Sequence, residues 1–319
     1  MYRLRFIKDN TRIQFMRGRF LGVATSAILS LISVVLFFHP GLNYGVDFRG
    51  GIVIEAAFQQ KPEFTAVRET LSHLNLGQVG LQEIGGSNAV TIRVERQEGG
   101  DEAQQVAVNA VRAALAKDFA GSTLQRVDAV GATVSAELMA NGMMALGFSM
   151  LAMLAYIWFR FEWQFGIGAV VTLLLDVTKT VGFYVIMDFQ FNLSSIAAIL
   201  AIMGYSINDK VVVYDRVREN LRRYKSMPLR ELIDLSINET LNRTVGTSLA
   251  AFLSALPLVI YGGEALREFS IVMLFGIVIA TTSSIFIAAP VLLFLGEKQL
   301  RRSASEVEGA EADAAPEAK

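Results

Sequence analysis

The chain has 319 residues, of which 53% are hydrophobic and only 18% are charged, whereas soluble domains carry about a quarter charged residues. It has no cysteine and only two histidines, so disulfides, thiolate chemistry and a histidine metal cluster are excluded. The formal net charge of −1 and the lack of phosphate-loop, zinc-protease and serine-hydrolase motifs give no sign of a nucleic-acid partner, a cofactor, a metal or an enzyme activity. This composition favours a protein of the lipid bilayer.

Six apolar segments have the length of roughly 20 residues that a membrane-spanning helix needs. They cover residues 20–38, 137–159, 165–187, 192–214, 240–261 and 269–295. Arginines precede the first segment as they would in a signal peptide, but its apolar run is longer and no small-residue cleavage site follows it. We therefore expect a retained transmembrane helix at 20–38 and five further transmembrane helices within 136–299.

Lysine and arginine residues are distributed unevenly between these helices. They are concentrated in residues 1–19, between the fourth and fifth helices and after the sixth, whereas the short links on the other side hold only Arg267. Basic residues favour the cytoplasmic side of a membrane. We therefore expect residues 1–19 to be a basic cytoplasmic segment, both chain ends to be cytoplasmic and residues 39–135 to be external, which in a bacterium is the periplasm.

Residues 39–135 are expected to form one external domain. Strand-like patterns at 51–58, 78–84, 89–95 and 123–131 accompany helical patterns at 63–75 and 101–119. Their order, β-α-β-β-α-β, predicts a ferredoxin-like unit with two helices on one face of a four-stranded sheet. The predicted fold class is an α-helical polytopic membrane protein with six transmembrane helices, N-in and C-in, and one external ferredoxin-like α+β domain. Residues 300–319 are acidic and alanine-rich, and they are expected to be a disordered tail.

The sequence GLNYGVDFRGG, residues 41–51, joins the first helix to the external domain. Its glycines, among them Gly45, Gly50 and Gly51, suit backbone positions with positive φ or with close approach. Asp47 suits a turn cap because its carboxylate can accept hydrogen bonds from nearby backbone amides. We expect a structural hinge here rather than a ligand site.

Asp209 interrupts the fourth apolar segment, with Asn208 and Lys210 on either side. An ionised carboxylate is costly in hydrocarbon, so such residues usually face a bundle interior or water and mark ion pathways. The alternative is a helix that ends earlier and leaves Asp209 at the cytoplasmic surface, but the apolar run KVVVY continues beyond the acid. Asp209 is therefore the first candidate for a proton site.

Arg243 is the expected partner of Asp209. It follows the start of the fifth segment by about four residues, and Asp209 precedes the end of the fourth by about six, so at about 1.5 Å per residue their depths agree within a turn. Arginine keeps its proton, so it would hold a nearby carboxylate ionised, and its withdrawal would favour the protonated acid. The alternative is that the Arg243 side chain extends to the membrane surface.

Asp176 lies about ten residues into the third segment, three residues before Lys179. An acid and an amine at this spacing share one helix face and can neutralise each other. The same two residues are also candidates for a second proton-relay site, and the sequence alone favours neither interpretation.

Three separated motifs resemble the SecF family: GLNYGVDFRGG at 41–51, GYSINDKVVVYDRVREN at 204–220 and SINETLNRTVGTS at 236–248. SecF is the smaller subunit of the bacterial SecDF auxiliary of the Sec translocon, and it is related to the resistance–nodulation–division transporters. The resemblance covers about residues 1–300 and so leaves out only the acidic tail.

The resemblance implies an inner-membrane complex with a SecD-like subunit, which uses the proton-motive force to help preproteins pass the Sec translocon channel. The family's proton-pathway aspartate falls on Asp209 and its arginine falls on Arg243. Lys179 departs from the apolar residue that is usual in the family, and residues 248–259 depart from its small and hydroxylated residues and place Pro257 in mid-helix. These departures concern the detail of the relay around the third and fifth helices.

Three other classes of protein compete with this interpretation. A small-molecule, proton-coupled exporter of the same superfamily would be expected to fuse two six-helix halves and to carry larger external domains. An intramembrane aspartyl protease could use Asp176 and Asp209 as a proton-sharing pair, but the glycine-x-glycine-aspartate motif is absent and Lys179 would disturb the pair. A purely structural assembly subunit would not need a buried acid.

Overall fold

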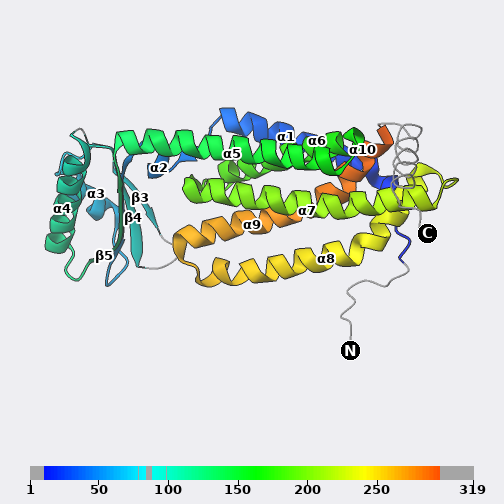
Figure 1. Cartoon of the computed structure of the whole chain (residues 1–319). Helices are drawn as coiled ribbons and strands as arrows, with labels where there is room; N and C mark the ends of the chain where they lie inside the picture. Colours follow the sequence, from blue (N-terminus) through cyan, green and yellow to red (C-terminus); the bar gives the residue numbers. More distant parts are fainter. Residues whose placement is uncertain (1–10, 78, 84–87, 98, 295–319) are drawn as a thin grey trace, which may run out of the picture. The chain divides into compact units, whose positions relative to one another are not determined.

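The computed structural model describes residues 11–294 except 78, 84–87 and 98 (Figure 1). The predicted tail at 300–319 and the first ten residues of the predicted basic segment lie outside the described residues. The chain divides into two compact units. The sheet unit comprises Asn43–Ala145 and Gln190–Ile196, and the helical unit comprises the described residues up to Leu42, Leu146–Phe189 and those from Ala197 onward.

The sheet unit is built on a four-stranded antiparallel sheet. Its elements are, in chain order, β2 (Gly51–Ala57), α3 (Phe64–Ser72), β3 (Val79–Glu83), β4 (Ala89–Val94), α4 (Gly100–Asp118) and β5 (Thr123–Val130). The strands lie in the order β3-β4-β2-β5, so the first strand of the four is central. Both helices cover the same face of the sheet (Figure 1).

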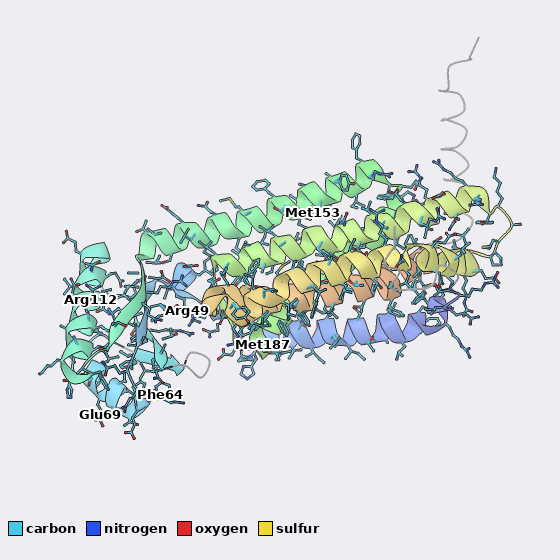
Figure 2. All side chains as sticks on the ribbon, turned by 90° about the horizontal axis from the view of Figure 1, so that it is seen from below. Arg49, Phe64, Glu69, Arg112, Met153 and Met187 are labelled. Carbon is cyan, nitrogen blue, oxygen red and sulfur yellow. The ribbon has the colours of Figure 1, made fainter. Side chains whose placement is uncertain are left out.

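Strand β2 is central because it pairs with β4 along one edge and with β5 along the other. Ile52, Ile54 and Ala56 have no exposed surface, and they contribute to one cluster with residues of both helices, including Leu71 of α3 and Val111 of α4. Each aliphatic side chain of this kind contributes about 1.5–3 kcal/mol when it is fully buried. In Figure 2, the labels of Phe64 and Glu69 locate α3, and the label of Arg112 locates α4.

The glycine-rich entry to β2 forms a small substructure of its own. Strand β1 (Asn43–Tyr44) pairs in parallel with β6 (Gln190–Phe191), and the short helix α2 (Val46–Arg49) follows β1. Gly50 and Gly51 then lead into the sheet with φ of +74° and +118°. A Cβ atom on Gly51 would lie 2.8 Å from the Val94 carbonyl oxygen, so both the backbone conformation and the space require glycine there.

The remaining elements are helices. The 3₁₀ turn η1 (Phe15–Gly18) leads into α1 (Arg19–Phe38), and α5 (Ala132–Arg160), α6 (Trp163–Ile186), α7 (Leu193–Arg223) and α8 (Leu229–Tyr261) follow. The last helix is α9 (Gly263–Ser283), which continues through the π-helical turn η2 (Ser284–Ala288) into α10 (Ala289–Phe294). Six helices among the described residues are long and apolar enough to cross a membrane, which confirms the predicted number.

Two of these helices are longer than the apolar segments that predicted them. Helix α7 has 31 residues and α8 has 33, and the turns near the connection between them are polar. Arg216 of α7 stabilises this end, because its guanidinium contacts Glu219 one turn along and Glu239 of α8, each at 2.6–2.7 Å. Helix α8 also continues past Pro257 to Tyr261.

Within the helical unit, α1 packs against α6, α6 against α9, and α8 against α9 (Figure 1). The turn η2 contacts both α1 and α6. A π-helical turn inserts one residue into the helical repeat, and such turns are often found at functional sites. In this protein it begins at Ser284, next to the buried polar groups described below.

Candidate functional site

Asp209 lies within α7, and only 5% of its surface is exposed. The hydroxyl groups of Thr244 on α8 and Ser284 on η2 and the positive charges of Lys210 and Arg243 are the groups that act on its carboxylate. Oδ2 of Asp209 is fully buried and has no hydrogen-bond partner in the described part of the chain. A buried carboxylate oxygen without a partner is costly when the group is ionised, so this position suits an acid that binds a proton.

Arg243 lies on α8, one residue before Thr244, and its side chain is exposed on the isolated chain. Its charge acts on Asp209, but within the described residues the two side chains form no ion pair. The structure therefore brings Arg243 near Asp209 while leaving the guanidinium free to move. An arginine exposed along a membrane-spanning helix needs water, a phosphate or a protein partner around it.

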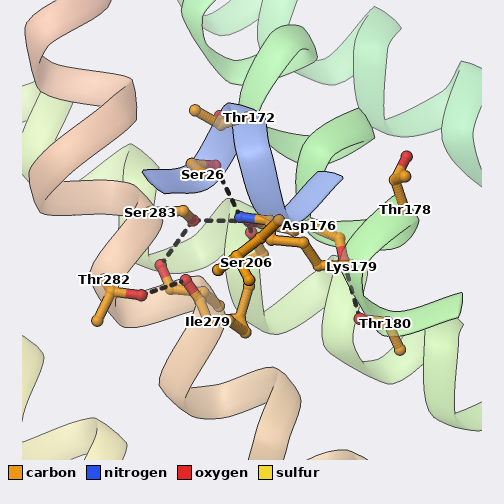
Figure 3. Close-up of polar contacts among 12 residues, drawn as sticks. Ser26, Thr172, Asp176, Thr178, Lys179, Thr180, Ser206, Ile279, Thr282 and Ser283 are labelled. Atoms are coloured by element: carbon orange, nitrogen blue, oxygen red, sulfur yellow. Dashed lines mark hydrogen bonds and ion pairs between the residues drawn. The ribbon is translucent and has the colours of Figure 1, made fainter. Parts of the chain in front are cut away.

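Asp176, on α6, is the centre of a second buried group of polar side chains (Figure 3). Its Oδ2 accepts hydrogen bonds from Ser283 at 2.7 Å, from Ser206 at 2.8 Å and from the Lys210 ammonium at 3.0 Å. Its Oδ1 faces the Lys179 ammonium at 3.2 Å. One carboxylate thus contacts two ammonium groups, and we call Asp176, Lys179 and Lys210 the lysine–aspartate cluster.

Lys210 has no exposed surface, although it follows Asp209 directly along α7. Its ammonium also donates to the Ser206 hydroxyl and lies 3.3 Å from Ser283 Oγ and 3.4 Å from the Ser206 carbonyl oxygen. Oxygen atoms therefore surround this charge and replace the water that it loses on burial. Sequence analysis did not assign Lys210 a role, and the only signal for one was its place inside an apolar segment.

Lys179 extends from α6 toward α1, where its ammonium donates to Ser26 Oγ at 3.1 Å. The expected pairing of Asp176 with Lys179 along one helix face is present. It is one part of a larger arrangement, because Asp176 also binds Lys210. These lysines surround Asp176 with positive charge, which is unlike the proton-sharing pair of aspartates that an aspartyl protease needs.

The glycine-rich segment makes its contacts with the residues that begin α7. Asp47 Oδ2 accepts a hydrogen bond from the Leu193 backbone amide at 2.9 Å, and Gly45 donates its amide to Phe191 at 2.8 Å. Leu193 is the first residue of α7, so Asp47 places a negative charge at the positive end of this helix dipole. The expected cap by Asp47 therefore acts on a helix far along the chain and not on its own loop. Among the described residues, no group of three or more His, Asp or Glu side chains could hold a metal ion.

Comparisons with known proteins relate the whole described chain to one family. The family "Protein export membrane protein SecD/SecF, C-terminal" matches residues 110–298, and the "SecD/SecF GG Motif" matches residues 35–62. The protein translocase subunit SecF of Rickettsia felis is 41% identical over 307 residues, which are 96% of this chain and 99% of that protein. The protein translocase subunit SecDF of Brucella abortus is 42% identical over 310 residues, which are 97% of this chain but only 40% of that longer protein.

Solved structures give the same result. A crystal structure of SecDF, a translocon-associated membrane protein from Thermus thermophilus, superposes with a TM-score of 0.82 at 29% identity, over 91% of this chain and 39% of that one. SecDF in a super-membrane-facing form superposes with a TM-score of 0.64 at 28% identity, over 94% of this chain and 40% of that one. On these matches, and on the agreement of the glycine-rich and Asp209 segments with the resemblance seen in the sequence, the chain belongs to the SecF family of protein translocase subunits.

Proposed function

We propose that the chain is a subunit of a bacterial inner-membrane complex, driven by the proton-motive force, that assists preproteins in passing the Sec translocon channel. Its relatives are named protein translocase subunits, and the six apolar helices make it a multi-pass membrane protein. The single observation that carries the proton coupling is Asp209, a buried acid in a membrane-spanning helix with one carboxylate oxygen that lacks a partner in the described structure.

The proposed topology has both chain ends in the cytoplasm and the sheet unit in the periplasm. The distribution of lysine and arginine supports this orientation. The β-α-β-β-α-β order and the strand order β3-β4-β2-β5 are those of a ferredoxin-like domain, which folds as one compact core. The segment from Gly45 to Gly51 acts in this proposal as the hinge of that domain.

Asp209 and Arg243 carry the proton step. When the Arg243 guanidinium approaches, Asp209 stays ionised, and when the guanidinium moves away the buried carboxylate takes up a proton. The hydroxyl groups of Thr244 on α8 and Ser284 on η2 act on Asp209, so a change in its charge changes its interaction with these two elements. Proton binding and release are thereby converted into movement of helices, which is what a gradient-driven export factor requires.

The proposed partner is a SecD-like subunit with a second helical bundle. The exposed face of α7 consists of small and polar side chains: Ala197, Ala201, Gly204 and Asn208. On α8, Arg243, Thr247, Ala250 and Ser254 are exposed as well, beside the apolar Leu253. Lipid provides no hydrogen bonds for such groups, and small residues allow helices to approach closely, so these two faces suit another protein and not hydrocarbon.

The test is the exchange Asp209→Asn, which keeps the size of the side chain and removes its titration. Gradient-driven preprotein export should fall to the level of cells that lack the chain, while the amount of the protein in the membrane stays unchanged. The matched control is Asp215→Asn on the same helix, whose carboxylate is about two-fifths exposed and pairs with Arg160. Wild-type export by the Asp209→Asn variant would remove the proton site from the proposal.

A further inference from the structure

We propose that the lysine–aspartate cluster is a second proton-exchanging centre, in which Lys179 releases a proton when Asp209 binds one. This inference rests on the proposed role of Asp209 and adds a second proton-binding site to it. Four observations support it: the balance of buried charges, the position of Lys210 between the two acids, the hydroxyl groups around the cluster and a cavity at Lys179.

The buried charges balance only when Asp209 is counted with the cluster. Asp176 carries one negative charge and faces two ammonium groups at 3.0 and 3.2 Å, which leaves one positive charge over. Asp209, the residue before Lys210, supplies the second carboxylate, and its own surface is 5% exposed. An uncompensated charge in this position would be strongly destabilising, so a change of charge on one of the four groups is expected to be balanced by a change on another.

Lys210 connects the two acids. Its ammonium contacts Asp176 on α6, while its charge also acts on the neighbouring Asp209, whose carboxylate faces α8 and η2. The other charged groups near Lys210 and Asp209 come from two helices. Asp176 and Lys179 belong to α6, and Arg243 belongs to α8. The other packed elements provide hydroxyl groups, namely Ser26 of α1, Ser283 of α9 and Ser284 of η2.

Lys179 is the member of the cluster that lines a cavity. A cavity of about 240 Å³ lies between α1, α6 and the α9–η2 segment, and Lys179 lines it together with Ser26, Thr282 and Ser283. Water takes up about 30 Å³ per molecule in the liquid, so this space holds several molecules beside polar side chains that can bind them. Lys210, in contrast, has no exposed surface.

The proposed step conserves both protons and charge. The Asp209 carboxylate gains one proton and becomes a neutral carboxylic acid. The buried set then holds one positive charge in excess, and the Lys179 ammonium loses one proton to water in the cavity and becomes a neutral amine. Lysine can do this when it is buried, whereas arginine cannot, because the guanidinium keeps its proton in proteins. The reverse exchange restores the starting state.

Lys179→Arg separates a proton-exchanging lysine from a structural positive charge. The cavity leaves room for the larger guanidinium, which keeps its charge beside Asp176. In cells whose own copy of the chain is replaced, we expect gradient-driven export to fall to the level seen without the chain, at unchanged membrane abundance. Lys225→Arg, an exposed lysine between α7 and α8, is the control and should leave export unchanged. Full export by Lys179→Arg would overturn the proposal.

A second pair of variants decides the matter if the arginine variant fails to accumulate. Lys179→His can still bind and release a proton, whereas Lys179→Gln is of similar size and cannot, so only the histidine variant should retain gradient-driven export. Equal export by the two variants, whether high or absent, contradicts the proposal. Asp209→Asn is measured in parallel. If Asp209→Asn abolishes export while Lys179→Arg retains export, only the role of Lys179 is contradicted. If Asp209→Asn exports normally, the proposed function itself is contradicted.

Discussion

Buried ionisable residues in this chain occur in two neighbouring groups with different surroundings. Asp176 has a hydrogen-bond partner on both carboxylate oxygens, whereas Asp209 has a buried oxygen without one in the described structure. A fully paired carboxylate resists protonation and an incompletely paired one favours it. This difference in surroundings is why the proposed proton site is Asp209, and why Lys179 is the proposed second group.

The role of Arg243 is tested by two substitutions. Arg243→Met should abolish gradient-driven export, because it removes the fixed charge that is proposed to control Asp209. Arg243→Lys should also be strongly impaired, since a lysine can lose its proton near hydrocarbon and lacks the guanidinium geometry. Export is measured in cells that carry only the variant, with Arg230→Lys, at an exposed position at the start of α8, as the control. Full activity of Arg243→Lys would mean that the Arg243 side chain extends to the membrane surface and does not control the charge of Asp209.

Sequence reasoning could identify Asp209 because a single acid inside an apolar segment is conspicuous. The contacts of Lys210 could not be found in this way. Its long side chain reaches Asp176 on another helix, 34 residues away in the sequence, and Ser283 lies 107 residues from Asp176. Which helix face meets which neighbour depends on packing among several helices, and hydropathy alone does not contain that information.

At the scale of single elements, the entry to the sheet unit depends on backbone conformation. The periodic patterns of the six segments in residues 51–131 are enough to suggest their type and order, because alternation and helical spacing are strong local signals. The pairing of β1 with β6 gives no such signal, since each strand has only two residues and the partners lie far apart in the chain. The hydrogen bond from the Leu193 amide to Asp47 likewise cannot be predicted from local sequence patterns.

Gly51→Ala should destabilise the sheet unit by about 1–3 kcal/mol, because alanine is strained at positive φ. The new Cβ atom would also lie 2.8 Å from the Val94 carbonyl oxygen. The measurement is the urea concentration at which a protease begins to cleave residues 43–130 of the purified full-length chain. The control is Gly80→Ala on β3, where the added Cβ atom would meet Arg93 Cβ at an ordinary 3.6 Å. Equal protease resistance of the two variants would show that the Gly51 conformation carries no such constraint.

At the scale of the whole molecule, burial is uneven among the membrane-spanning helices. In the most apolar stretches of α6, α7 and the α9 segment, about half of the residues are buried within the chain. In the corresponding stretches of α5 and α8, only 11% are buried. Apolar side chains on such faces suit lipid equally well, so exposure alone does not identify an interface. The informative faces are those of α7 and α8, because they expose Asn208, Arg243 and Thr247.

Gly204→Leu should weaken the proposed complex with a SecD-like partner without disturbing the chain itself. Gly204 lies in the middle of the exposed face of α7, and apart from its chain neighbours and the nearby backbone of its own helix, no described atom lies within 4 Å of a Cβ atom placed on it. A leucine there would hold an approaching helix away from the backbone, and each 1.4 kcal/mol of association free energy lost lowers the association constant about tenfold. The measurement is the ratio of partner to tagged chain after purification in mild detergent. Gly147→Leu on α5, where the space around the glycine is also open, is the matched control and should keep the wild-type ratio. An unchanged ratio for Gly204→Leu would exclude this face of α7 from the partner interface, and an equal loss for both variants would mean that the effect is not specific to that face.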